Sequence, residues 1–304
     1  MAGRKGIVLT AFSTAYAAGK TLFAINMAAG LAERGAKVCL ADLDLQFGDV
    51  CHYLKLQPEW TVADAQRAAL RNPESLRVTE YLTPYDRENV RFDVLANPLL
   101  LEEAYNMDIQ VIRHLIGELQ VEYDYVVIDT TSTFSALNLS IMDLSTVVYY
   151  MGIIDFIPTI KDMKIGADLV KDLGYNSRKI RFILNRSNAR TRIAIDDVVR
   201  ILGREFDFLL PNDFRSAQQS IQQGVPLMVG HGDTELARQI GSIVSDYIPQ
   251  GQTRDRGGRS EGGWIGRLFF LREESSIAVQ NSPYRTGTID EGKAYPGYSQ
   301  HAGF

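Results

Sequence analysis

The sequence predicts an α/β fold, a doubly wound, mostly parallel sheet of seven or eight strands with helices on both sides. Short apolar runs alternate with amphipathic runs as far as about residue 250, and this alternation is typical of strand–helix–strand units. Residues 125–129 form a continuous apolar run that ends in a carboxylate, as expected for a strand covered on both faces. With 45% apolar and 23% charged residues in 304, the chain can form a sizeable core.

The expected elements follow one another in a regular order. Residues 6–12 predict a buried first strand, and a helix follows from residue 20 to about Arg34, where Gly35 can end it. Residues 37–42 predict the second strand, and a polar, helix-rich stretch continues from there to about residue 91. The remaining expected elements are strands 92–96, 125–129, 146–151, 180–184 and 206–210, and helices 109–121, 158–173, 216–223 and 235–247.

The composition changes at Pro249, so we expect one domain over residues 1–249 and three segments after it. Residues 250–263 are dominated by Gly, Arg, Ser and Gln, which is typical of a flexible linker. Residues 264–272 combine Trp, Ile, Leu and Phe with arginines, which suits a short helix on an anionic membrane surface. Packing on the domain or docking on a partner fits that segment too. Residues 273–304 are polar and predict a disordered tail.

Charge and cysteine content narrow the possible functions. The net charge of −5 argues against a general nucleic-acid binder, so nucleic acid is not an expected partner. Cys39 and Cys51 are the only cysteines, and they form no disulfide framework or metal spacing, which favours a reducing compartment. We see no signal peptide and no run near the roughly 20 apolar residues of a membrane span, so we expect a cytoplasmic protein.

A phosphate-binding loop follows the first expected strand. Residues 14–21 read Thr-Ala-Tyr-Ala-Ala-Gly-Lys-Thr, and a strand, a loop ending in Gly-Lys-Thr and a helix is the P-loop arrangement that binds nucleoside triphosphates. Backbone N–H groups of the loop and the helix N-terminus point at the phosphates. Lys20 would contact the β and γ phosphates, and the Thr21 hydroxyl would ligate Mg²⁺. Gly19 and Leu22 complete the expected binding segment.

Three carboxylates are expected at the same edge of the sheet. Asp42 and Asp44 end the second strand, and Asp129 ends the central strand. The carboxyl ends of parallel strands face the ligand crevice, so these residues could hold Mg²⁺ through water and orient an attacking water. A nucleoside triphosphate and Mg²⁺ are therefore the expected ligands, and the resemblance described below implies that the nucleotide is ATP. Thr21, Asp42 and Asp129 form the expected metal site, with Asp44 and Lys20 as the expected catalytic residues.

On these motifs the sequence resembles the MinD/ParA superfamily of deviant Walker-A ATPases over roughly residues 5–250. Residues 41–50, Ala-Asp-Leu-Asp-Leu-Gln-Phe-Gly-Asp-Val, are similar to the CpaE/TadZ branch, whose members place Tad-type pilus assembly machinery. That branch often has a receiver-like domain before the ATPase domain. Since the first expected strand starts at residue 6, we expect that domain to be absent or removed.

The resemblance implies further site residues and partners. Asn185 stands where family members bind the adenine edge with an amide, and Arg186, Pro211 and Asp213 belong to the segments that lie near the base. A homodimer formed over the nucleotide face is implied, with pilus or secretion assembly proteins as partners. The expected location is the cytoplasm, peripheral to the inner face of the membrane or at a cell pole.

The loop departs from the family pattern Lys-Gly-Gly-x-Gly-Lys-Thr. Ala15 replaces the first lysine, which reaches across the family's dimer to the partner's nucleotide, and Tyr16 and Ala17 replace the next two glycines. A methyl group cannot neutralise charge on a transferred phosphoryl group, and a Cβ atom restricts backbone that glycine leaves free. We therefore expect weak or absent hydrolysis and weakened nucleotide binding. Asp44, the water-orienting acid by resemblance, is retained.

Three functions follow as hypotheses. The first is an ATP-binding, dimerising localisation or scaffold protein. The second is an active ATPase that cycles between monomer and dimer, in which Lys161 or Lys164 supplies the missing charge. The third is a nucleotide-free structural module in which the Tyr16 ring fills the phosphate cavity.

Overall fold

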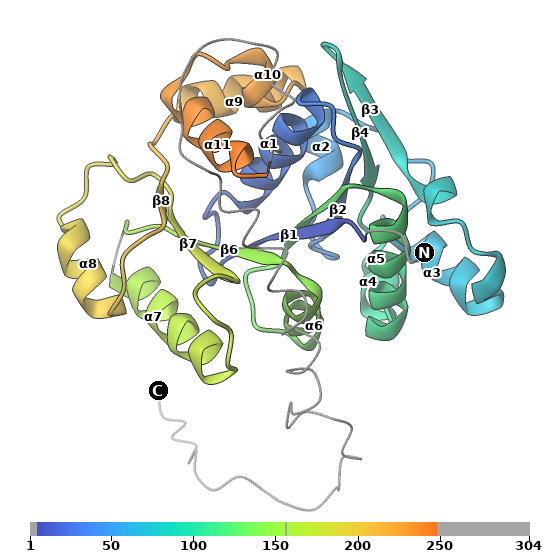
Figure 1. Cartoon of the computed structure of the whole chain (residues 1–304), viewed down its shortest axis with the longest axis horizontal. Helices are drawn as coiled ribbons and strands as arrows, with labels where there is room; N and C mark the ends of the chain where they lie inside the picture. Colours follow the sequence, from blue (N-terminus) through green and yellow to red (C-terminus); the bar gives the residue numbers. More distant parts are fainter. Residues whose placement is uncertain (1–4, 156, 248–304) are drawn as a thin grey trace, which may run out of the picture. The chain divides into compact units, whose positions relative to one another are not determined.

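The computed structural model describes residues 5–155 and 157–247, and Figure 1 shows their arrangement. Within these residues one sheet has the strand order β3-β4-β2-β5-β1-β6-β7-β8. β3 runs antiparallel to β4, and the other neighbouring strands are parallel. The expected doubly wound, mostly parallel α/β sheet is confirmed. The expected linker 250–263, the apolar segment 264–272 and the tail 273–304 lie outside the described residues.

The strands are β1 Ile7–Phe12, β2 Val38–Leu43, β3 Thr83–Arg87, β4 Val90–Leu95, β5 Tyr125–Thr130, β6 Val147–Gly152, β7 Ile180–Leu184 and β8 Phe208–Leu209. The helices are α1 Lys20–Glu33, α2 Val50–Leu54, α3 Val62–Arg71, α4 Leu101–Tyr105, α5 Ile109–Glu122, α6 Ala136–Leu144, α7 Ile157–Asp172, α8 Ile195–Leu202, α9 Phe214–Gln223, α10 Leu227–Gly230 and α11 Glu235–Ser245, with short 3₁₀ turns at Pro73–Ser75 and Val78–Tyr81.

The structure differs from the sequence prediction mainly at the edges of the sheet. β3 lies within the stretch expected to be helix-rich, because it is a polar edge strand in which only Tyr85 is buried. β8 is shorter than the expected strand 206–210. Helices α4, α6, α8 and α10 were not predicted. Of these, α6 and α8 are nine and eight residues long, too short to show several turns of apolar periodicity.

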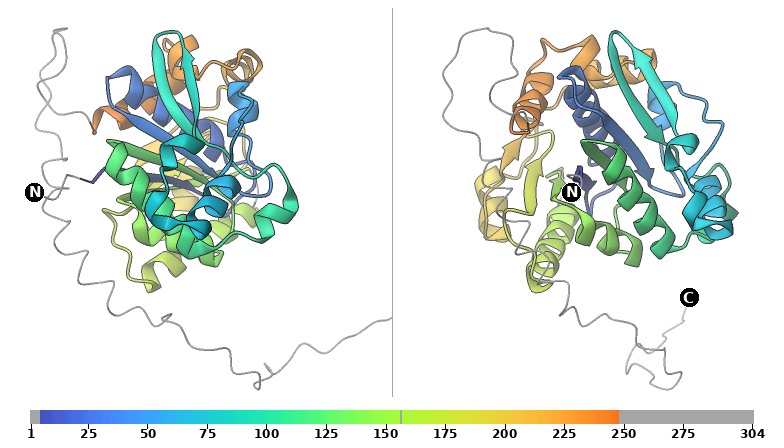
Figure 2. Two further views of the ribbon diagram at one scale, coloured as in Figure 1. Left: turned by 90° about the vertical axis from the view of Figure 1, so that its right-hand side faces the viewer. Right: turned by 45° about the vertical axis from the view of Figure 1, so that its right-hand side comes forward.

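Two layers of helices cover the sheet. α1, α9, α10 and α11 lie on one face, and α5, α6, α7 and α8 lie on the other (Figure 1). The β3–β4 hairpin extends beyond the body of the sheet in all views (Figure 2). α1 is buried along most of its length, because its small residues allow close approach. A Cβ added at Gly30 would lie 3.0 Å from Val244 of α11.

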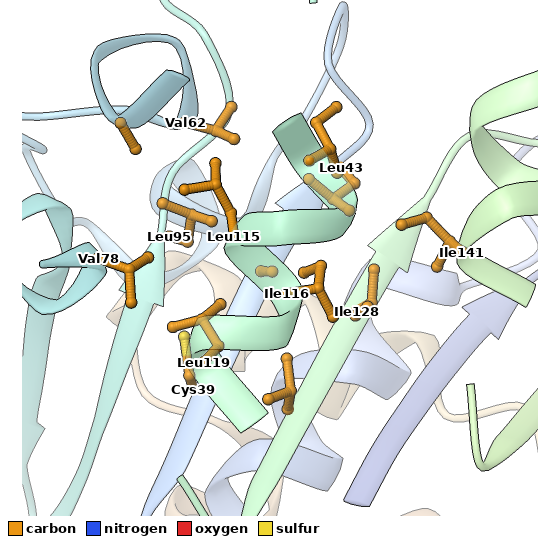
Figure 3. Close-up of a cluster of buried hydrophobic side chains, with 14 of the residues drawn as sticks. Cys39, Leu43, Val62, Val78, Leu95, Leu115, Ile116, Leu119, Ile128 and Ile141 are labelled. Carbon is orange, nitrogen blue, oxygen red and sulfur yellow. The ribbon is translucent and has the colours of Figure 1, made fainter. Parts of the chain in front are cut away.

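The core beneath α5 holds the ends of β2 and β5 in place. Leu115, Ile116 and Leu119 point from α5 onto Leu43 of β2 and Ile128 of β5 (Figure 3). Each of these side chains is at most 1% exposed, and full burial of one such side chain stabilises the fold by about 1.5–3 kcal/mol. These contacts therefore fix the positions of the carboxyl ends of the two strands relative to α5.

Strand register then decides which side chains meet at that edge. β5 lies between β1 and β2, so Asp129 is opposite Ala11 on one side and opposite Asp42 on the other. The loop after β1 and the two carboxylates consequently share one edge of the sheet. No helix within the described residues is long and apolar enough to cross a membrane.

Gly166→Ala should destabilise the protein by about 2 kcal/mol, because α7 crosses β6 too closely for a side chain. A Cβ at Gly166 would lie 2.0 Å from Tyr150 Oη and 3.0 Å from Thr14 Cγ2. Urea unfolding followed by circular dichroism measures the change. The matched control is Gly117→Ala on α5, where an added Cβ has nothing within 4 Å and helix propensity favours alanine. Equal midpoints for both variants would contradict the packing argument.

Candidate functional site

The loop between β1 and α1 contains two residues with left-handed backbone angles. Gly19 has φ +91° directly before Lys20, the first residue of α1, and Ala17 has φ +55°. Both angles lie in the left-handed region that favours glycine. A Cβ at Gly19 would also lie 2.5 Å from Asn185 Nδ2. Glycine is therefore required at position 19, whereas Ala17 adopts this conformation in spite of its side chain.

Side chains from β6 and from the loop after β5 hold the first half of this turn. Thr14 Oγ1 and Tyr150 Oη lie 2.8 Å apart and share a hydrogen bond. Ser132 Oγ lies 3.2 Å from the Ala15 carbonyl, to which it can donate. Thr14, which stands in place of the first glycine of the nucleotide-binding pattern, is thus tied to the buried Tyr150.

The end of β7 holds the second half. Asn185 Nδ2 donates to the Ala18 carbonyl at 2.9 Å, and Arg186 Nη2 donates to the Ala17 carbonyl at 3.2 Å. Arg186 also lies 3.4 Å from the carboxylate of Asp155, at the end of β6. The Asn185 amide retains one N–H and one lone pair for a base, since its Oδ1 accepts one further bond, from the Arg186 N–H.

Lys20 and Thr21 point toward the carboxyl edge of the sheet. Lys20 is 9% exposed, and its Nζ donates to Ser132 Oγ at 2.7 Å. The Thr21 hydroxyl donates to Asp129 Oδ2 at 2.5 Å. The second oxygen of Asp129, Oδ1, is buried without a protein partner. An unpaired buried carboxylate oxygen is costly, so this oxygen is suited to a cation or an ordered water.

Asp42 is closed off by its own loop. Its Oδ1 accepts from the Asp44 N–H at 3.2 Å and its Oδ2 from the Val50 N–H at 3.1 Å. A Cβ at Gly48 would lie 2.4 Å from Oδ2, so only glycine fits beside this carboxylate. Asp42 can therefore act on a metal through water more readily than by direct ligation.

Burial raises the proton affinity of both neighbouring carboxyl groups, and nearby carboxylates add to it, Asp44 at Asp129 and Asp129 at Asp42. Burial raises the pKa of Asp129 to about 7, against the Thr21 hydrogen bond and the Lys20 ammonium, which lower it. Burial also raises the pKa of Asp42 well above its usual value, and the Asp129 charge raises it further. Like charges in neighbouring strands disfavour ionisation of both groups. A divalent cation would reverse that preference.

Asp44 is half-buried and faces the same edge. Its Oδ1 accepts from the Phe47 N–H at 3.3 Å. Burial raises the pKa of Asp44, and the Phe47 hydrogen bond and the Lys20 ammonium oppose that rise. Among the described residues no group of three His, Cys, Asp or Glu side chains could hold a metal. Mg²⁺ commonly uses one or two carboxylates together with phosphate oxygens and water, which fits this edge.

The third hypothesis, a Tyr16 ring inside the phosphate cavity, does not agree with the structure. Tyr16 is 82% exposed, and Phe47 of the neighbouring loop is 66% exposed. The Tyr16 ring therefore points into solvent. Of the two lysines considered for the missing charge, Lys161 is exposed and Lys164 pairs with Asp168 at 2.6 Å on α7.

The remaining predicted site residues lie on α1, beside the segment that follows β7 and at the start of α9. Leu22 is half-buried on α1. Pro211 is buried just after Leu210, whose carbonyl accepts from the Ser187 N–H at 2.9 Å. Asp213 caps α9, since its side chain accepts from the Ser216 N–H at 3.1 Å. That carboxylate is therefore committed to a helix end as well as lying in the segment expected near the base.

Sequence reasoning missed the side chains that support the loop. These are Ser132, Tyr150 and Asp155, each located just after or at the end of a central strand. Ser132 and Tyr150 reach the loop from 112 and 136 residues away in sequence. The available signal was general: polar residues at the carboxyl ends of parallel strands gather at one edge.

Comparisons with known proteins agree with this geometry. A family model described as AAA domain matches residues 16–155. An uncharacterised ATP-binding protein of Methanocaldococcus jannaschii is 26% identical over 243 residues, covering 78% of this chain and 87% of that protein. A ParA family ATPase from Chlorobium tepidum TLS has a similar structure, with a TM-score of 0.72 and 20% identity, over 80% of this chain and 99% of that one. The septum site-determining protein MinD from Pyrococcus horikoshii OT3, complexed with Mg-ADP, gives a TM-score of 0.68 at 18% identity, over 82% and 100% of the chains.

In the metal-free protein, Asp129→Asn should be more stable than the parent at pH 8 by about 1 kcal/mol or more. The folded state binds the Asp129 proton more tightly than the unfolded chain, so the parent loses stability as the pH rises from 3.8 to about 7. The variant lacks that loss of stability. The stability difference between variant and parent should therefore shrink toward pH 5. Thermal unfolding in EDTA at several pH values measures it, with the exposed Asp172→Asn as control. A pH-independent difference would contradict the assignment to Asp129.

Proposed function

We propose that this chain, which is similar to MinD and ParA family proteins, is an ATP-binding, dimerising localisation or scaffold protein of the MinD/ParA type with weak or absent hydrolysis. The observation that supports this most directly is the bond from Thr21 to Asp129, beside an unpartnered Asp129 oxygen. A hydroxyl and a carboxylate held together at a helix N-terminus are the groups that a nucleotide-bound Mg²⁺ uses in P-loop proteins.

The residues present fit ATP and Mg²⁺. Thr21 and Asp129 would hold the metal, with Asp42 acting through water. Lys20 would exchange its bond to Ser132 for the β and γ phosphates, since its ammonium already lies at the loop. The magnesium ion would supply charge neutralisation of the phosphates.

The base would lie at the end of β7. Asn185 retains hydrogen-bonding capacity there, and Arg186, Pro211 and Leu22 would surround the ring and ribose. Gly19 would allow the backbone to approach the phosphates closely. Asp213 would contribute indirectly, by capping the N-terminus of α9.

Weak hydrolysis follows from the substituted loop. Ala15 is 5% exposed and carries no charge, so this chain cannot send the family's lysine to a partner's phosphates. Lys20 still supplies one positive charge, and Asp44 still could orient water. Transition-state charge would thus be only partly neutralised, and the protein's output would be positioning of a partner.

The cellular role proposed is placement of a Tad-type pilus or related secretion assembly, as in the CpaE/TadZ branch. This role rests on the similarity of the sequence of residues 41–50 to that branch. The protein would act as a homodimer with assembly proteins as partners, in the cytoplasm at the membrane's inner face or at a pole. Residues 264–272 would contact the membrane surface after the linker 250–263, and the nucleotide domain would comprise residues 1–249.

An active ATPase that cycles between monomer and dimer is the second candidate. Asp44 favours it, because the half-buried carboxylate lies close enough to Lys20 to feel its charge. Lys161 is exposed on α7 and could reach another copy.

Addition of ATP and Mg²⁺ should convert the monomer to a dimer, because the bound nucleotide and metal balance the charges of Lys20, Asp42 and Asp129 at the carboxyl edge of the sheet. Light scattering coupled to size exclusion measures the mass, and fluorescent ATP measures binding. Lys20→Ala should weaken ATP binding by about 100-fold, the effect of losing a charged hydrogen-bonded partner of phosphate, and should remain monomeric. The exposed Lys171→Ala is the matched control. An unchanged mass with bound ATP would contradict the dimer, and absence of binding would contradict the function.

Ala15→Lys should raise ATP turnover by about tenfold or more, because it restores a cation that can reach a partner's phosphates. A coupled assay for ADP measures turnover, and Ala15→Lys combined with Asp44→Ala should return to the parent rate. Brisk turnover of the parent protein that is lost on Asp44→Ala would overturn the proposal of weak hydrolysis and support the active ATPase.

A further inference from the structure

The phosphate loop adopts a conformation that its own residues do not favour. Ala17 has φ +55°, and a residue with a Cβ is disfavoured at this angle relative to glycine. Tyr16, the preceding residue, is 82% exposed and gains little from packing. A support outside the loop must therefore stabilise this backbone.

That support comes from two consecutive side chains at the end of β7. Asn185 Nδ2 donates to the Ala18 carbonyl at 2.9 Å and Arg186 Nη2 to the Ala17 carbonyl at 3.2 Å. The two carbonyls are also consecutive, so one short segment holds the turn at its strained residue and at the next one.

The backbone and the side chain of Arg186 are themselves held in place by neighbouring groups. It has φ +55°, its N–H donates to Asn185 Oδ1 at 2.9 Å, and its guanidinium lies 3.4 Å from Asp155 Oδ2. The guanidinium thus bridges a carboxylate at the end of β6 and a carbonyl of the loop. A planar guanidinium can make two such contacts in fixed directions, whereas a lysine ammonium has no rigid fork.

We propose that Arg186 and Asp155 are positioning residues that hold the glycine-poor loop in its phosphate-binding conformation before nucleotide arrives. They replace the conformational freedom of glycine with a bridge from two neighbouring strands. The proposal rests on the proposed function for its ligand, ATP. Its conformational part concerns the nucleotide-free protein and can be tested without any ligand.

The competing explanation is that Arg186 acts only as a positive charge near the phosphates. The two explanations differ in two variants. If charge alone matters, Arg186→Lys should behave as the parent and Ala17→Gly should have no bearing on the Arg186 effect. If the bridge matters, Arg186→Lys should not hold the loop as the parent does. Ala17→Gly should then make Arg186 dispensable, because glycine accepts the left-handed angle.

The first test is hydrogen–deuterium exchange of peptides covering residues 13–19 in the full chain without nucleotide. Arg186→Ala and Arg186→Lys should speed exchange by about fivefold or more, the effect of losing a charge-assisted hydrogen bond, and Asp155→Asn should act in the same direction. Arg190→Ala, an exposed arginine in the same connection, is the matched control. Unchanged exchange in Arg186→Ala, with an unchanged thermal midpoint, overturns the proposal.

The second test is a double-mutant cycle on ATP affinity. Arg186→Ala should weaken ATP binding by about tenfold in the parent, and by less than about twofold in the Ala17→Gly background. Equal losses in both backgrounds overturn the bridge. If no variant and no parent binds ATP, the proposed function fails, while the exchange experiment still decides whether Arg186 holds the loop.

Discussion

Three parallel strands lying side by side determine where chemistry can occur in this protein. β5 lies between β1 and β2, and its last residues place Asp129 directly beside Asp42 and next to the loop that leaves β1. The apolar contacts of α5 keep these strand ends in register. Burial and nearby carboxylates disfavour ionisation of both groups, and a divalent cation bound there would reverse that preference.

The loop beside these carboxylates keeps its turn although it lacks most glycines of the nucleotide-binding pattern. Thr14 bonds to Tyr150, Ala15 lies against Ser132, and the carbonyls at 17 and 18 are held from β7. A glycine-rich loop carries its conformational freedom in its own backbone. Here the turn depends on the ends of several strands, so its geometry is a property of the whole carboxyl edge.

The sheet, α1 and the Gly19–Lys20–Thr21–Asp129 set could be predicted, because buried strands and a helix that starts at a phosphate loop have strong local patterns. The supports could not, because Ser132 and Tyr150 lie more than 100 residues from the loop and meet it only through the strand order. β3 was not predicted for another reason. Only Tyr85 is buried in it, and a polar edge strand has no apolar alternation.

The two edges of the sheet limit how copies of this protein can associate. β3 contains Pro84, which has no N–H to donate, and the charged Asp86 and Arg87, while β8 has only two residues. Neither edge offers a long row of unpaired backbone groups to another strand. Within the described residues, sheet extension is therefore disfavoured at both edges, and any association of copies there would use side-chain surfaces, which separate and re-form more readily than a continuous backbone ladder.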